Sequence, residues 1–364
     1  MKIRFNKNLI KDYSWIPFLN PVLWQPKDQS SSKIWVYDNQ QVKKWEEIWK
    51  DILTSTNIEN CDFWVYPKNF RIDFYNELKK ENDFCKKHNK RLIVFYDDDN
   101  EFPINLDNCI VFRNSISKKN PDNEYCMPAF IPPLKECNKS KQAKEISIWY
   151  VWYLKAPSIN LNKRKNYSRI RNILYKWLTY TKITNLISDK ICVEPQHKRN
   201  TLWYLLLQKW VWITIRSKII KEISKYSHFK TNFIKRKNKL DPSITGIRRK
   251  EYIDNISQNT FSLVMRWDWN FSYRLYEIMS IWNIPIFIDT DCRMPLENKI
   301  NYKDLFVRCP INDVKNIDIY ITNFLQSHER LEEVKQNILK TYNEYLTFDS
   351  RCKKICELLM NKTS

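Results

Sequence analysis

The feature that most constrains the fold of this chain is its near lack of glycine. One glycine, Gly246, occurs in 364 residues, where average usage predicts roughly 25. A chain of this length needs glycine wherever the backbone turns left-handed or must approach a ligand closely. The same sequence has 15 tryptophans, and several of these lie at positions where backbone geometry favours glycine.

Five tryptophans stand out in this way. Trp267 and Trp269 lie in the segment RWDWN, between a predicted strand and a predicted helix. Trp282 directly follows that helix, and Trp149 and Trp152 lie in the predicted strand ISIWYVWYL. One hypothesis is that these letters stand for glycine, because UGA is read as tryptophan in some bacteria and as glycine in others. RWDWNFS then becomes R-G-D-G-N-F-S, which is a typical phosphate loop. The alternative is that the tryptophans are real and form an unusually aromatic core.

Other tryptophans fit their positions. Trp45 and Trp49 are four residues apart in the helical run QQVKKWEEIWKDIL, where both lie on one helix face. The recoding hypothesis therefore need not apply to the whole chain.

The composition is that of a globular protein with a strong positive charge. Hydrophobic residues make up 43%, charged residues 28%, and the net charge is +21, which favours an anionic partner. Bias towards lysine, asparagine and isoleucine codons explains this charge equally well. No apolar stretch reaches the roughly 20 residues of a membrane span, and the N-terminus lacks the apolar core of a signal peptide. We expect a cytoplasmic protein, with peripheral contact at the inner face of an anionic membrane as an option.

The ten cysteines contain no Cys-x-x-Cys pair, so we expect reduced, buried thiols and neither a disulfide framework nor a metal site. The four histidines, likewise, have no ligand spacing.

Strand-like and helix-like segments alternate along the chain, which predicts an α/β fold with parallel sheets. We expect an N-terminal Rossmann-like lobe at residues 1–140, with a linker near 134–144, a C-terminal lobe at 141–345 and a tail at 346–364. The predicted strands are Lys33–Tyr37, Phe63–Tyr66, Arg91–Tyr96, Cys109–Arg113, Ile146–Tyr153, Phe261–Arg266 and Ile284–Asp289. The predicted helices are Gln41–Leu53, Phe70–His88, Lys163–Thr179, Arg216–Tyr226, Ser272–Ile281 and Ser327–Tyr345, the last with Leu331, Val334, Ile338 and Tyr342 on one face.

The unit from Phe261 to Asp289 carries the clearest chemistry. A strand–loop–helix unit attracts phosphate at the start of its helix, through free N–H groups and the helix dipole. Arg266, Asn270 and Ser272 lie in or beside this loop, and Arg274 lies in the first helical turn, where a guanidinium could clamp a diphosphate. Glu277 could accept hydrogen bonds from ribose hydroxyls. The competing interpretation is a surface ion pair between Arg274 and Glu277.

Acidic residues follow two of the predicted strands. Asp97, Asp98 and Asp99 end the strand RLIVFY at an edge where ligands collect in α/β sheets, so they are candidates for a catalytic base. An Asp-x-Asp metal motif is the alternative, and we favour an acidic turn without metal. Asp289 and Asp291 either line the expected phosphate-binding pocket or cap their turn.

The run from Phe261 to Cys309 resembles the C-terminal signature of exostosin-like proteins, glycosyltransferase family 47. The matching positions are Arg266, Asn270 to Ser272, Arg274 to Glu277, Ile284 to Pro285, Asp289 to Asp291 and Met294 to Pro295, and the segments Asn108 to Arg113, Glu124 to Pro128 and Lys230 to Arg236 are similar to blocks in bacterial members. The resemblance covers roughly residues 60–350. Where the family has glycine, this chain has Trp267, Trp269 and Trp282.

The resemblance implies a GT-B fold, with two Rossmann-like lobes and the donor held by the C-terminal lobe. It implies inverting transfer of a sugar from a nucleotide-diphosphate donor, typically UDP-linked, to a glycan or glycolipid acceptor in cell-surface polysaccharide synthesis. No cofactor or metal is expected.

Two other functions compete with this one. Basic, aromatic stretches such as KTNFIKRKNK and RKNYSRIRNILYKW would suit a nucleic-acid-binding protein, although that function leaves the Arg–Glu helix and the acidic turn unexplained, and no nucleic-acid partner is expected. A non-catalytic GT-B scaffold at the membrane surface is the other alternative.

Overall fold

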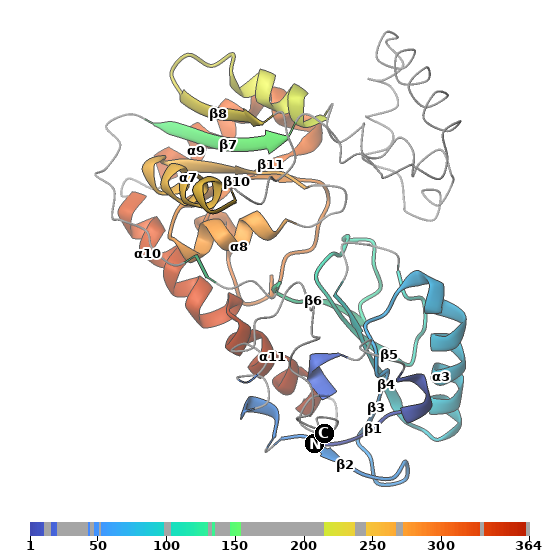
Figure 1. The fold of residues 1–364 in the computed structure, drawn as a ribbon. Coiled ribbons are helices and arrows are strands. Elements are labelled where there is room, and N and C mark those ends of the chain that lie inside the picture. The colour runs from blue at the N-terminus through green and yellow to red at the C-terminus, as the bar shows by residue number, and fades with distance from the viewer. Residues whose placement is uncertain are drawn as a thin grey trace, which may run out of the picture.

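The protein is described by a computed structural model for residues 1–10, 16–19, 43, 47–50, 52–97, 103–129, 133–134, 146–153, 215–236, 245–266, 272–327 and 331–361. It has an α/β fold with two parallel sheets of six and five strands, flanked by helices (Figure 1). The expected strand Lys33–Tyr37, the helix Lys163–Thr179 and most of the linker lie outside the described residues.

The first sheet lies within the expected N-terminal lobe. Its strands run in the spatial order β2-β1-β3-β4-β5-β6, and every pairing is parallel. They are β1 (Lys2–Arg4), β2 (Thr54–Ser55), β3 (Phe63–Val65), β4 (Arg91–Tyr96), β5 (Cys109–Arg113) and β6 (Glu124–Cys126).

Both faces of the first sheet are covered, which is why β4 and β5 are almost continuously apolar. Successive side chains of β4 point to opposite faces of the sheet. Ile93 and Phe95 pack in the hydrophobic core on one face, and Leu92 and Val94 pack in the core on the other. The second face is covered by α3 (Tyr75–Lys87), which buries Leu78 and Cys85.

The second sheet lies beyond the expected boundary at residue 140. Its order is β11-β10-β9-β7-β8, again with parallel pairings throughout. The strands are β7 (Ser147–Tyr153), β8 (Lys230–Arg236), β9 (Phe261–Val264), β10 (Ile284–Asp289) and β11 (Val307–Pro310). Since β8 lies on one side of β7 and β9 on the other, the strand order reverses between β7 and β9. In open α/β sheets, ligands bind outside the carboxyl ends of the strands at such a point.

Residues 215–223 are helical, and the longer helices of this part are α7 (Thr245–Gln258), α8 (Tyr273–Ser280), α9 (Ile317–Ser327), α10 (Leu331–Thr341), the π-helix η8 (Tyr342–Leu346) and α11 (Phe348–Met360). Short 3-10 helices are η1 (Lys7–Leu9), η2 (Pro17–Leu19), η3 (Ile72–Phe74), η6 (Tyr302–Asp304) and η7 (Ile311–Asn316). The expected apolar face of the closing helix is confirmed, because Val334, Ile338 and Tyr342 are buried in the second core and Leu331 packs against it.

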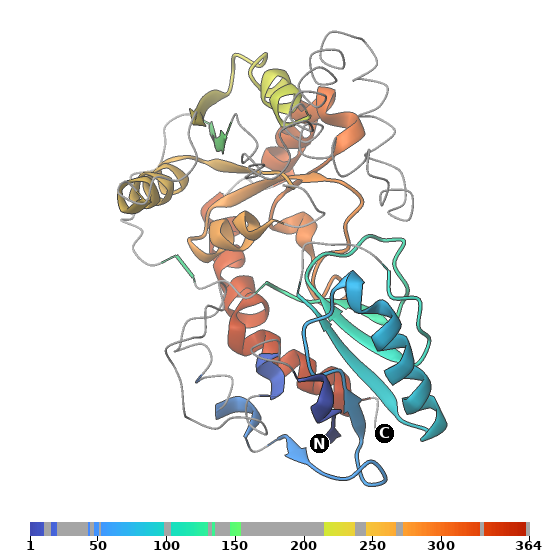
Figure 2. The same ribbon diagram turned by 45° about the vertical axis from the view of Figure 1, so that its right-hand side comes forward.

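Residues 346–364, expected to be a tail, contain a packed helix. α10, η8 and α11 run from the second sheet back to the first, and α11 lies beside β1 (Figures 1 and 2). Cys352, Ile355 and Leu359 are fully buried in the same cluster as Ile3 of β1. The C-terminal helix therefore belongs to the first lobe's core.

The two lobes are also joined by a backbone contact, which we call the interlobe bridge (residues 116–118 with 291–293). Ser117 pairs with Cys292 as an antiparallel bridge. The amide of Lys118 donates to the carbonyl of Asp291 at 3.1 Å, and that of Arg293 donates to the carbonyl of Ile116 at 3.0 Å.

Trp282 occupies the left-handed position predicted for it. Its φ is 50°, its amide donates to the carbonyl of Met279, and the amide of Asn283 donates to that of Ile278. These are the two bonds of a Schellman motif, whose C′ residue is usually glycine. The same motif ends α3, where Asn89 has a φ of 51°.

All eight cysteines within the described ranges are buried and free, as expected of reduced thiols. No described helix combines the length and apolar character needed to cross a membrane.

Candidate functional site

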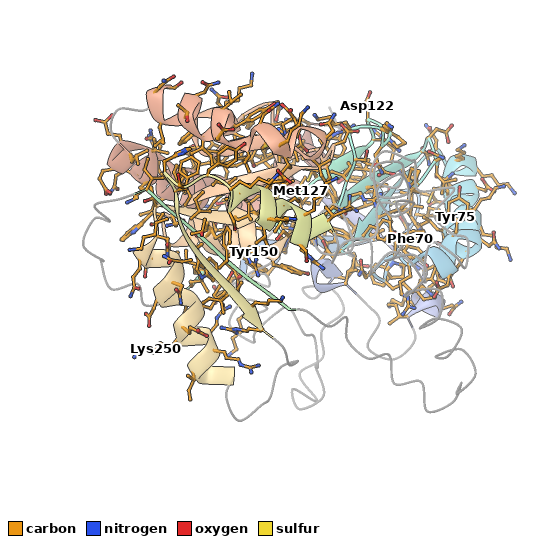
Figure 3. All side chains as sticks on the ribbon, turned by 90° about the horizontal axis from the view of Figure 1, so that it is seen from above. Phe70, Tyr75, Asp122, Met127, Tyr150 and Lys250 are labelled. Carbon is orange, nitrogen blue, oxygen red and sulfur yellow. The ribbon has the colours of Figure 1, made fainter. Side chains whose placement is uncertain are left out.

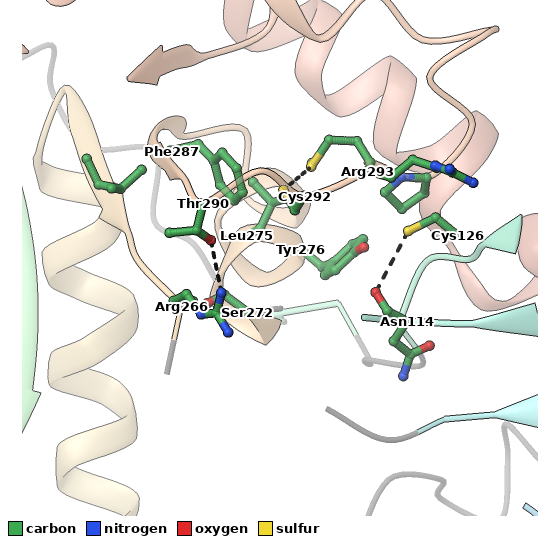
Figure 4. Close-up of a pocket in the computed structure, with 13 residues that line it drawn as sticks. Asn114, Cys126, Arg266, Ser272, Leu275, Tyr276, Phe287, Thr290, Cys292 and Arg293 are labelled. Atoms are coloured by element: carbon green, nitrogen blue, oxygen red, sulfur yellow. Dashed lines mark hydrogen bonds between the residues drawn. The ribbon is translucent and has the colours of Figure 1, made fainter. Parts of the chain in front are cut away.

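The carboxyl ends of strands from both sheets meet at one narrow pocket. Arg266 follows β9 and Thr290 follows β10, while Asn114 follows β5 and Cys126 ends β6 on the other side (Figure 4). Ser272, which precedes α8, adds a hydroxyl group to the lining. The pocket therefore lies where ligands collect in sheets of this kind.

The lining combines guanidinium and hydroxyl groups. Arg266 is buried, and its Nη1 lies 3.4 Å from Oγ1 of Thr290. Ser272 has extended backbone before α8, and its side chain makes no capping hydrogen bond. Arg293 adds a second guanidinium, held by the carbonyls of Glu124 at 3.2 Å and Asn120 at 3.0 Å. These groups can donate hydrogen bonds to an anion.

The rest of the lining is neutral. Burial raises the pKa of the Tyr276 phenol and of the Cys292 thiol well above their usual ranges, so both remain protonated at neutral pH. The cavity is about 20 Å³, which is room for about one water molecule. A nucleotide-sized ligand would therefore require the pocket to widen.

Arg274 lies outside this pocket, at the neighbouring strand β7. Its guanidinium donates to the carbonyl of Val151 at 3.2 Å and lies 4.6 Å from the ring centroid of Tyr150 and 5.8 Å from that of Trp149. Its pKa is raised: burial opposes this, but nearby Tyr150 and other groups outweigh it, so the guanidinium stays charged. Arg266 and Arg274 thus lie at strands β9 and β7, on the two sides of the point where the strand order reverses.

Glu277 is not hydrogen-bonded to Arg274. It accepts hydrogen bonds from Arg249 at 2.8 Å and from the Tyr252 hydroxyl at 2.6 Å, both on α7. The carboxylate therefore ties α8 to α7.

Asp289 caps its own turn, which was one of the two roles expected. One carboxylate oxygen accepts from the amide of Cys292 at 3.1 Å, and the other lies 2.9 Å from Nε of Arg308. Asp291 has a φ of 64°, is exposed, and lies 3.8 Å from Lys118 of the first lobe.

Asp97 lies at the carboxyl end of β4, as expected, but its charge is already compensated. Its carboxylate is 2.5 Å from Nη2 of Arg351, which is fully buried on α11. The same guanidinium donates to Oδ1 of Asn114 at 3.0 Å and to the carbonyl of Pro128 at 2.6 Å. This arrangement favours a structural role for Asp97 and aligns Asn114 at the pocket.

Asn270, Asp98, Asp99, Trp267 and Trp269 lie outside the described residues. In the described parts of the chain, His, Cys, Asp and Glu side chains form no group of three that would suit a metal ion.

Sequence reasoning missed three polar residues of the pocket: Asn114, Thr290 and Arg293. Thr290 lies inside the acidic turn Asp289 to Asp291 that the sequence indicated, and Arg293 follows that turn by two residues, so a signal was present for both. Asn114 gave none, because only the fold brings its strand end opposite β9.

Trp149 is fully buried in β7 beside Arg274. The ring of Tyr252 packs edge-on against it, with the two ring centroids 5.1 Å apart. Its indole Nε1 is buried with no hydrogen-bond partner among the described atoms, although buried tryptophans usually find one. Glycine at this position would leave space beside the Arg274 guanidinium.

No protein-family model matches the chain, and a search of curated proteins finds no match either.

Proposed function

We propose that this chain is a GT-B glycosyltransferase of the exostosin-like type, which transfers a sugar from a nucleotide-diphosphate donor, typically UDP-linked, to a glycan or glycolipid acceptor. The observation that carries the proposal is the placement of two arginines on either side of the reversal in strand order: Arg266 follows β9, and Arg274 contacts Tyr150 and Val151 of β7.

In this proposal the donor's diphosphate lies at the start of α8. The two guanidiniums offset the charge that develops on the leaving nucleotide as the acceptor oxygen displaces it. Ser272 and the first-turn amides of α8 donate to phosphate oxygens. The acceptor approaches from the first lobe, where Asn114 faces the pocket. We assign no catalytic base, because Arg351 already neutralises Asp97.

The proposal is tested by the thermal shift that UDP and UDP-sugars produce. Two forms of the chain are compared, the printed sequence and one with glycine at 149, 152, 267, 269 and 282. We expect nucleotides to raise the Tm of the glycine form, because only this form has a loop that lets phosphate approach the backbone. Arg266→Ala and Arg274→Ala in the glycine form should abolish the shift.

The control is Arg71→Ala, which removes an exposed arginine of the first lobe. It should leave the shift unchanged. If nucleotides shift neither form, the proposed function is wrong. Equal shifts in both forms would instead contradict the recoding of tryptophan.

A further inference from the structure

A second and much larger cavity lies on another side of the junction between the lobes. Its volume is about 420 Å³, within the range of small-molecule sites. One wall is β6 with Met127, the second is the segment 293–299 after β10, and the third is the last turns of α11. Met127 and Asp122, which are labelled in Figure 3, both line it. We call this the α11 cavity.

The α11 cavity has an apolar part. Met127 and Met294 are buried, and Leu296 and Leu358 are half-buried. Tyr125 adds a partly buried ring. A ligand with a hydrocarbon body could remove this surface from water, at about 25 cal/mol per Å².

The cavity also has a local excess of positive charge beside α11. Lys354 and Lys299 share one carboxylate, Glu357: the Lys354 ammonium is hydrogen-bonded to it, and that of Lys299 lies 3.7 Å away. Two ammoniums and one carboxylate leave a charge of +1. The two ammoniums are near each other because both contact the same carboxylate oxygen of Glu357, and the hydrogen bond and charge of Lys354 lower the pKa of Lys299.

Each of the other carboxylates of the lining faces an arginine, although Arg308 is shared between Glu297 and Asp289. Asp122 lies 3.9 Å from Arg293, and Glu297 lies 3.4 Å from Arg308. Glu124 is buried against Arg113 at 2.6 Å. The excess positive charge is therefore local to the group formed by Lys299, Lys354 and Glu357, and an anion at the two lysines would meet it.

From this arrangement we propose that the α11 cavity binds a small amphiphilic anion, with its charged group between Lys299 and Lys354 and its apolar body against Met294, Leu296 and Leu358. The proposal does not depend on the donor site. Because the walls come from both lobes, the ligand holds the lobes in their present arrangement. Cys126, Arg293 and Met294 line both this cavity and the candidate functional site, so an occupant of one contacts the wall of the other.

The test uses anilinonaphthalene sulfonate, a fluorescent amphiphilic anion, titrated into the folded chain. We expect saturable binding that Lys299→Gln and Lys354→Gln each weaken about tenfold, as expected for loss of a hydrogen bond to a charged group. Lys353→Gln is the matched control, since Lys353 is exposed on the same helix and outside the lining. It should bind the probe like the unchanged chain.

Competition experiments then test whether binding needs both the charged group and the apolar body of the ligand. Hexyl phosphate should displace the probe, whereas inorganic phosphate and hexanol at the same concentration should not. Lys299 is 43% exposed, so its replacement should leave the fold intact, which an unchanged Tm will verify. Unchanged affinity in both lysine variants, or equal displacement by phosphate or hexanol alone, would overturn the proposal.

Discussion

The tryptophans of this chain differ in how well their positions suit an indole. The Trp64 N–H donates to a carboxylate oxygen of Glu81 at 2.8 Å. Trp49 packs edge-on against Phe18, with the ring centroids 4.6 Å apart. Trp149 buries its N–H without a described partner, and Trp282 holds a left-handed backbone. The first two positions make use of the indole. Trp282 has the backbone conformation that glycine adopts most readily, whereas Trp149 also packs edge-on against Tyr252 and differs from the first two only in its N–H.

Trp282→Gly should therefore stabilise the protein. A non-glycine residue in the left-handed region costs roughly 1–2 kcal/mol, and the half-buried indole returns only part of this. We expect the free energy of unfolding to rise by about 1 kcal/mol, measured by urea denaturation. Trp282→Ala retains the steric cost and should show no such gain. A loss of stability in the glycine variant would mean that the indole's packing outweighs the backbone cost.

Helix α11 is joined to residues that follow strands of the first sheet. Arg351 is its central residue, with Asp97, Asn114 and Pro128 as partners. Removing one member of a buried pair costs more than the pair contributes, because the remaining charge loses its partner.

Arg351→Met should lower the free energy of unfolding by roughly 3–5 kcal/mol. Urea denaturation measures this loss, and hydrogen exchange should place the increased opening in β4 and β5. The double variant Arg351→Met with Asp97→Asn removes the unpaired charge and should recover part of the stability. If the double variant is no more stable than the single one, lost packing rather than lost pairing is responsible.

The elements also show what the sequence can predict. The bounds of β4, β5 and β10 were predicted exactly, because buried parallel strands are short, apolar and β-branched. α11 was missed, since its buried face includes Arg351 and Lys354, which sequence patterns place in solvent. β8 was read as a basic stretch, because as an edge strand it exposes its lysines. The candidate site was predicted only in part. Motifs indicate Arg266 and Ser272, but tertiary contacts, which motifs do not reveal, turn Arg274 towards β7 and Glu277 towards α7.

For the whole molecule, the buried thiols predict how stability depends on pH. Burial raises the pKa of Cys109 in the first lobe and of Cys309 in the second from about 9 to about 12. A group whose pKa is higher in the folded state stabilises the fold fully below its unfolded pKa, and this contribution is lost as the pH rises through the folded value.

The free energy of unfolding should therefore fall between about pH 9 and 12. The fall contributed by each thiol is at most about 1.4 kcal/mol per pH unit. Urea denaturation at a series of pH values measures the slope, and Cys109→Ala should make it shallower because one titrating group is removed. The same slope with and without Cys109 would mean that other groups control alkaline unfolding.

Because the two thiols lie in different cores, joined by α11 and the interlobe bridge, a single transition whose midpoint shifts with pH would show that the lobes unfold as one unit.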